Sequence, residues 1–151
     1  MNRFLISILI FLSSFSFAKD SVMSQYVHDG WSISLKNEWY SDNDENLVSF
    51  YDPQGHGVLQ VSSYTKNTLV TESDLKELAK EHIEAGARFK SYEQSGSQVI
   101  TLAFGFDGSF WQYWYISIGS SALVVTYNCA EEDRNIEIES VKSMVSTIKA
   151  T

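Results

Sequence analysis

The strand predicted over residues 109–118 is apolar or aromatic on both faces, and it constrains the fold more than any other segment. Successive side chains of a strand point to opposite faces of the sheet. One face would carry Phe110, Trp114, Ile116 and Ile118, and the other would carry Trp111, Tyr113 and Tyr115. A sheet with one solvated face alternates apolar and polar residues more cleanly. The sheet is therefore either covered on both faces or exposes an aromatic patch.

Turn signals place this strand in an antiparallel meander from about residue 89 to residue 128. Asp107-Gly108 is a strong signal for a two-residue hairpin turn. Gly119-Ser120-Ser121 marks the turn after the aromatic strand. The predicted strands of the meander are 89–94, 98–106, 109–118 and 122–128.

The segments on either side of the meander supply more strands and two helices. Residues 31–35 alternate as a half-buried strand does, 36–46 is a polar segment predicted as a loop, and 47–64 is a predicted hairpin. Thr71 and Asp74 fit a capping box that begins a helix over 72–86, and Gly86 fits its end. A last helix follows Glu131-Glu132-Asp133 and carries the apolar stripe Ile138, Val141, Val145 and Ile148. The predicted fold class is α+β, a mostly antiparallel sheet with two helices packed on it.

This order of elements resembles the Mog1/PsbP-like fold, which includes periplasmic DcrB-type proteins and related bacterial domains. The resemblance covers about residues 26–149. It rests on Trp39, the hairpin 47–64, the Thr-rich link into helix 72–86, the run 111–115, the closing strand 123–129, and a last helix with Val141, Met144, Val145 and Ile148. The resemblance implies a three-layer sandwich and mostly non-enzymatic roles in binding, chaperoning or assembling other proteins. It carries no transferable active site.

Residues 1–18 have the pattern of a cleavable signal peptide. Arg3 supplies positive charge, 4–12 is apolar except for Ser7, and Ser16-Phe17-Ala18 fits a small-residue cleavage site. The apolar run is too short to span a bilayer, which needs about 20 residues. We therefore predict an exported protein with a signal peptide over 1–18 and a single domain over 19–151. DcrB-type proteins are typically lipoproteins, whereas no cysteine lies at this cleavage site.

The charge balance restricts the partners of the exported chain. Removal of residues 1–18 takes away Arg3 and no acidic residue, which leaves 10 basic and 19 acidic residues. Nucleic-acid binding needs a basic footprint, and anionic membrane surfaces attract basic proteins, so neither is expected. An acidic surface is compatible with a basic protein partner.

The single cysteine, Cys129, cannot form an internal disulfide, so it is predicted to be buried in a strand, with an intermolecular disulfide as the alternative.

Motifs for catalysis, metals and cofactors are absent or incomplete. His28, His56 and His82 have no metal-ligand spacing, and no phosphate-binding or dinucleotide-binding loop occurs. Asp42, Asp44 and Asn46 match the start of a calcium loop, but Leu47 and Pro53 stand where glycine and glutamate are required. No cofactor, metal site or catalytic residue is therefore predicted.

Large aromatic side chains are the remaining candidates for function. Tryptophan and tyrosine bury much area and keep a polar group, so they are frequent at binding interfaces. The candidate binding residues are Trp39, Tyr40, Asp42, Asp44, Glu45, Trp111 and Tyr113. We expect an exported, non-enzymatic domain that binds another protein as an immunity protein, chaperone or assembly factor. The alternative is a cell-envelope protein that binds a glycan, a lipid or a metal ion.

Overall fold

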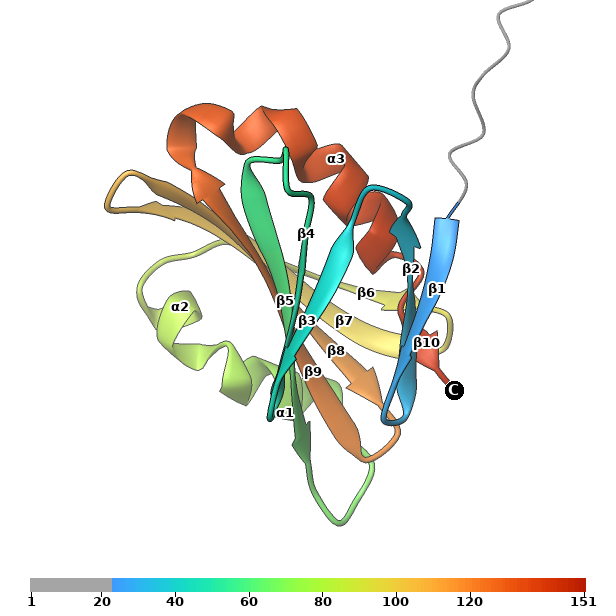
Figure 1. Cartoon of the computed structure of the whole chain (residues 1–151). Coiled ribbons are helices and arrows are strands. Elements are labelled where there is room, and N and C mark those ends of the chain that lie inside the picture. The colour runs from blue at the N-terminus through green and yellow to red at the C-terminus, as the bar shows by residue number, and fades with distance from the viewer. Residues whose placement is uncertain (1–22) are drawn as a thin grey trace, which may run out of the picture.

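A computed structural model describes residues 23–151 and places most of them in two antiparallel sheets (Figure 1). The predicted signal peptide, residues 1–18, lies outside the described residues. The larger sheet has seven strands in the order β3-β4-β5-β9-β8-β7-β6. Its strands are β3 (Tyr40–Asp44), β4 (Leu47–Tyr51), β5 (Gly57–Thr65), β6 (Phe89–Gln94), β7 (Ser97–Phe106), β8 (Ser109–Ile118) and β9 (Ser121–Ala130).

Two short helices cover one face of this sheet. They are α1 (Glu72–Leu78) and α2 (Lys80–Glu84), and Leu75 and Ala79 are the fully buried side chains beneath them. Leu75 and Ala79 pack in one cluster with Ile100, Leu102 and Tyr115 of the sheet. This layer is thin, because both helices together bury only these two side chains completely.

The opposite face is covered by a longer helix and a small second sheet. The helix α3 (Arg134–Val145) follows a 3₁₀ turn, η1 (Glu131–Asp133), and the small sheet contains β1 (Met23–His28), β2 (Trp31–Lys36) and β10 (Lys149–Ala150) in the order β1-β2-β10. Their apolar residues pack with Phe110, Trp114, Ile116 and Ile118 of β8 in the larger of the two buried clusters. The molecule therefore has three layers, with the sheet in the middle (Figure 1). This architecture confirms the predicted α+β sandwich, and both faces of β8 are largely covered.

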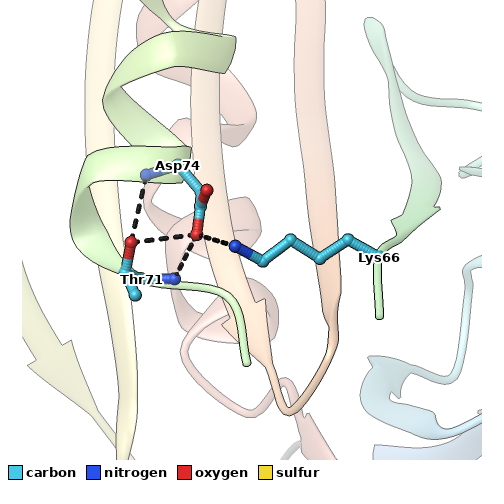
Figure 2. A network of polar contacts seen from close by, with 3 residues as sticks. All are labelled: Lys66, Thr71 and Asp74. Atoms are coloured by element: carbon cyan, nitrogen blue, oxygen red, sulfur yellow. Dashed lines mark hydrogen bonds and ion pairs between the residues drawn. The ribbon is translucent and has the colours of Figure 1, made fainter. Parts of the chain in front are cut away.

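The first turn of α1 has the predicted capping box (Figure 2). The Asp74 amide donates to Thr71 Oγ1 at 3.3 Å, and the Thr71 amide donates to Asp74 Oδ2 at 2.7 Å. Lys66, which lies before the helix, donates to the same carboxylate oxygen. The pattern Thr71-x-x-Asp74 therefore fixes where the helix begins.

Several elements differ from the sequence expectations, among them the last helix, which ends at Val145 before Ile148, and β10, which was not expected. The predicted helix 72–86 is divided at the buried Ala79 into α1 and α2, although alanine favours helices. Ala79 keeps right-handed helical dihedral angles, and the Ile83 amide still donates to its carbonyl at 3.1 Å, so the interruption is slight. β1 was not expected. The segment 36–46, predicted as a loop, contains β3, whose five residues are all exposed. Asp, Asn and Ser are poor strand formers, so backbone pairing with β4 determines that strand.

The Asp107-Gly108 turn and the position of Cys129 agree with the expectations from the sequence. Asp107 and Gly108 both have positive φ, of 48° and 74°, as a two-residue hairpin turn requires. Cys129 is buried at the end of β9, as expected for a small apolar side chain. Burial also raises the pKa of its thiol. Within residues 23–151 no helix is long and apolar enough to cross a membrane.

Candidate functional site

The β7–β8 hairpin extends past the end of α2 (Figure 1). A groove lies between the hairpin and the end of α2. On the α1–α2 face, cross-strand pairing places Phe104 opposite Trp111 and Leu102 opposite Tyr113. α1 covers Leu102 and Tyr115, whereas α2 stops before the tip of the hairpin. The open part of this face is a groove of about 760 Å³. We call it the aromatic groove and define it by His82, Arg88, Phe104, Phe106, Trp111 and Tyr113.

The end of α2 forms one wall of the groove, and its geometry follows from Gly86. Gly86 has a φ of 93°, in the left-handed region that glycine tolerates best. The Ala87 amide donates to the His82 carbonyl at 2.9 Å, and the Gly86 amide donates to the Ile83 carbonyl at 3.0 Å. These are the two hydrogen bonds of a Schellman motif. The motif turns the chain away from the helix so that residues 85–88 line the groove.

Stacked rings form the floor of the groove. The ring of His82 lies 4.7 Å from that of Phe104 and 4.8 Å from that of Tyr113, measured between ring centroids. Tyr113 also stacks on Phe104, at 5.7 Å, and Trp111 lies 6.2 Å from Tyr113. Partial burial raises the pKa of the Tyr113 hydroxyl above its usual value, so this group remains a neutral hydrogen-bonding group.

Phe106, at the tip of the hairpin, is the most exposed ring of the groove. It is 70% exposed and therefore contributes little to the core. Trp111 and Tyr113 are half-buried, so each ring is held by its neighbours and still has surface available. Rings of this kind, fixed by stacking and open on one side, can bind an apolar or aromatic group with little loss of side-chain entropy.

The candidate residues from the sequence do not form one patch. Trp111 and Tyr113 line the aromatic groove. Tyr40, Asp42 and Asp44 are exposed on β3, at the edge of the sheet opposite β6, and Glu45 lies in the following turn with a φ of 42°. Trp39 is only 7% exposed and packs in the larger buried cluster, so it belongs to the core and not to a binding surface.

Sequence reasoning missed His82, Arg88, Phe104 and Phe106 as groove residues. A signal for the two phenylalanines was present, because the Asp107-Gly108 turn fixes the register and places Phe104 opposite Trp111. No comparable signal existed for His82 or Arg88. Their position depends on where α2 ends relative to the hairpin.

Groups for catalysis or metal binding are dispersed. His56 pairs with Asp133 through Nδ1 at 3.2 Å, and His28 stacks on Tyr26 in the small sheet. In the described part of the chain, no three His, Cys, Asp or Glu side chains are grouped as metal ligands. The chemistry that the aromatic groove itself offers is ring stacking, hydrogen bonding from Tyr113 and the positive charge of Arg88.

Comparisons with known proteins identify the fold. No model of a known protein family matches the chain, and no curated protein matches it. Among solved structures, cyanobacterial PsbP (CyanoP) from Synechocystis sp. PCC 6803 superimposes with a TM-score of 0.63 at 14% identity, covering 93% of this chain and 99% of that protein. A crystal structure from Bacteroides thetaiotaomicron VPI-5482 gives a TM-score of 0.66 at 15% identity and covers 84% of this chain. The chain spans 48% of the length of that Bacteroides protein.

The fold is therefore PsbP-like, as the order of elements in the sequence indicated. At 14–15% identity, the likeness concerns the fold alone.

Proposed function

We propose that this protein is an exported, non-catalytic domain that binds a segment of another protein in the aromatic groove. In this proposal residues 1–18 are removed as a signal peptide and residues 19–151 form the binding domain. The observation that carries it is the cluster of stacked, partly open rings around the exposed Phe106. Tryptophan, tyrosine and arginine are the side chains that most often dominate protein interfaces, and this groove contains all three.

Charge indicates the kind of segment that would fit. The chain has 19 acidic and 11 basic residues. α2 carries the exposed residues Glu81 and Glu84, and the hairpin turn carries the exposed residue Asp107. A partner segment with an apolar or aromatic anchor between basic residues would complement this surface, and carboxylates at the rim of an interface mainly accelerate association. Neutralising, escorting or assembling the partner are the three roles that such binding supports.

A photocrosslinking amino acid at position 106, in cells of the producing organism, tests whether a protein occupies the groove. We expect one discrete protein adduct at position 106. The matched control is position 69, where the native leucine is 73% exposed and lies outside the groove. Equal adducts at both positions, or none at position 106, would contradict protein binding at this site.

The crosslinked partner, once purified, allows the groove to be tested by affinity. Phe106→Ala and Trp111→Ala should each weaken binding by about 30-fold or more, because an interface hot spot contributes at least about 2 kcal/mol. Phe106→Ala removes an exposed ring and should leave folding within about 0.5 kcal/mol of the wild type. Leu69→Ala is the matched control and should bind like the wild type in isothermal titration calorimetry.

Binding of a small molecule is the second candidate, because the groove volume of about 760 Å³ lies in the range of ligand pockets. A ligand of that kind should raise the melting temperature of the protein by mass action. Trp111→Ala should remove that increase. A compound that meets both conditions, together with no adduct at position 106, would support this candidate over the first.

A further inference from the structure

A second groove lies on the opposite face of the sheet, between the edge strand β6 and the C-terminal half of α3. Its volume is about 400 Å³. Three cationic side chains line it, Arg88, Lys90 and Lys142, and its aromatic and apolar lining includes Tyr92, Trp114 and Val145. We call it the cationic groove. It shares Arg88 with the aromatic groove, and otherwise the two are largely separate.

The register of β6 explains why the charges face this side. Lys90 pairs with Thr101 and Tyr92 with Val99, so the even-numbered residues of β6 lie on the α3 face. The side-chain Nε2 of Gln94 then donates to the Val145 carbonyl at 3.1 Å, which joins the end of β6 to the end of α3. The edge strand and the helix thus hold their cations on the two sides of one groove.

The charge of this groove contrasts with that of the whole chain. No aspartate or glutamate lines it, although the chain has 19 acidic residues. Within residues 23–151, four of the six other lysines and arginines are paired with carboxylates. These are Lys66, Lys76, Lys80 and Arg134. Among residues 23–151, Arg88 and Lys90 form no ion pair, and Lys142 pairs only with the exposed Glu139, at 3.0 Å. Two uncompensated cations beside an apolar surface attract an anion from solution.

The polar groups of the floor are already used within the protein. Gln112 Nε2 donates to Thr101 Oγ1 at 2.7 Å and to the Leu102 carbonyl at 3.1 Å. Thr101 Oγ1 donates to the Tyr113 carbonyl at 2.8 Å. The floor therefore offers mainly shape and apolar contact. The charged donors at the rim are ammonium and guanidinium groups, which bind carboxylate, phosphate or sulfate oxygens.

We propose that the cationic groove binds a small organic anion, with its carboxylate or phosphate at Arg88 and Lys90 and its apolar body on Tyr92, Trp114 and Val145. This inference does not depend on the function proposed for the aromatic groove. A soluble anion fits better than an anionic membrane, because the net charge of the chain is −8 and such a surface would repel it.

Titration with octyl phosphate and octanoate tests the proposal, with calorimetry for affinity and backbone amide NMR for position. We expect saturable binding, with shifts concentrated in residues 88–94 and 142–146. Octanamide, which has the same body without the charge, should bind at least about tenfold more weakly, since one charged contact corresponds to a factor of that order. Inorganic phosphate, which has no apolar body, should also bind more weakly. Equal binding of octanamide, or shifts elsewhere, would overturn the proposal.

Substitution of a lysine at the rim of the cationic groove tests where the charged group of the ligand binds. Lys90→Gln should weaken octyl phosphate binding by roughly tenfold and reduce its dependence on salt. Lys80→Gln makes the same change on α2, on the other face of the sheet, and should have no effect. Both lysines are exposed, so neither change should impair folding. Equal affinities of Lys90→Gln and the wild type would refute the assignment. If the protein cosedimented with phosphatidylglycerol vesicles, Arg88 and Lys90 would be assigned to a membrane surface instead. That result would also refute the proposal of a small organic anion.

Discussion

At the scale of single residues, Gly57 and Glu137 show how α3 is attached to the sheet. The Gly57 amide donates to Glu137 Oε2 at 3.0 Å, and the Tyr127 hydroxyl donates to the same oxygen at 2.9 Å. Burial and the bond to Glu137 raise the pKa of Tyr127. A Cβ atom at position 57 would lie 2.5 Å from the Asn128 carbonyl and from the Tyr127 ring. Only glycine lets the backbone pass this close to β9.

Gly57→Ala should therefore destabilise the protein by about 1–3 kcal/mol, the usual cost of overpacking. The free energy of unfolding in urea measures it. Gly105→Ala is the matched control, because a Cβ atom there would meet mainly the flexible carboxylate of Glu131 at 3.3 Å. If both variants were equally stable, the close approach at position 57 would not be the reason for glycine.

At the scale of elements, the start of α1 depends on one carboxylate. Asp74 accepts hydrogen bonds from Lys66, from the Thr71 amide and from the Thr71 hydroxyl (Figure 2). The Lys66 contact and the two Thr71 bonds lower the pKa of Asp74 from 3.8 to about 2. Because the folded pKa is below the unfolded one, ionised Asp74 stabilises the fold above about pH 4. This contribution is lost as the pH falls from about 4 toward 2.

Asp74→Asn should be less stable than the wild type at neutral pH, and the difference should shrink below about pH 4. Urea unfolding of both proteins at a series of pH values measures this difference in free energy of unfolding. The other titrating groups contribute equally to both proteins, so their contributions cancel in the difference. Ser73→Ala changes an exposed neighbour that has no ionisable group. Its free energy of unfolding should differ from that of the wild type by the same amount at every pH. A difference between Asp74→Asn and the wild type that persists unchanged to pH 2 would show that the charge of Asp74 does not stabilise α1.

At the scale of the whole molecule, the two outer layers are attached unequally. α1 and α2 bury Leu75 and Ala79 completely, whereas α3 buries a longer stripe that contains Ile138, Val141, Met144 and Val145. Local opening costs less where fewer apolar side chains are buried. The α1–α2 layer is also the one that forms a wall of the aromatic groove, so this site lies beside the less strongly held layer.

Native-state hydrogen exchange should show this inequality. We expect amides of α1 and α2 to exchange through openings of lower free energy than those of β9 and β8, with α3 closer to the strands. Measurement by NMR at increasing urea concentration gives each opening free energy. Protection of α1 and α2 equal to that of β9 would mean that the molecule opens only as one unit.

Much of the fold was predictable because its determinants are local. The Thr71–Asp74 box, Gly86 and the Asp107-Gly108 turn act through neighbouring residues, and the two-faced apolar pattern of 109–118 is visible in the sequence. The strand β3 was not predictable, because its pairing with β4 determines it. The same holds for β1, which pairs with β2. No residue in the sequence marks the interruption at Ala79, because alanine favours helices.

The candidate site also has some features that the local sequence determines and others that depend on tertiary packing. The sequence alone determined that residues 109–118 are apolar or aromatic on both faces, and that the Asp107-Gly108 turn joins them to the preceding strand in a hairpin. Only the tertiary structure decided which rings are open. Trp39 is buried, whereas Phe106 and parts of Trp111 and Tyr113 remain accessible because α2 ends before the hairpin does. Exposure depends on where separate elements come to rest against each other, and that is a property of the packed chain rather than of any local pattern.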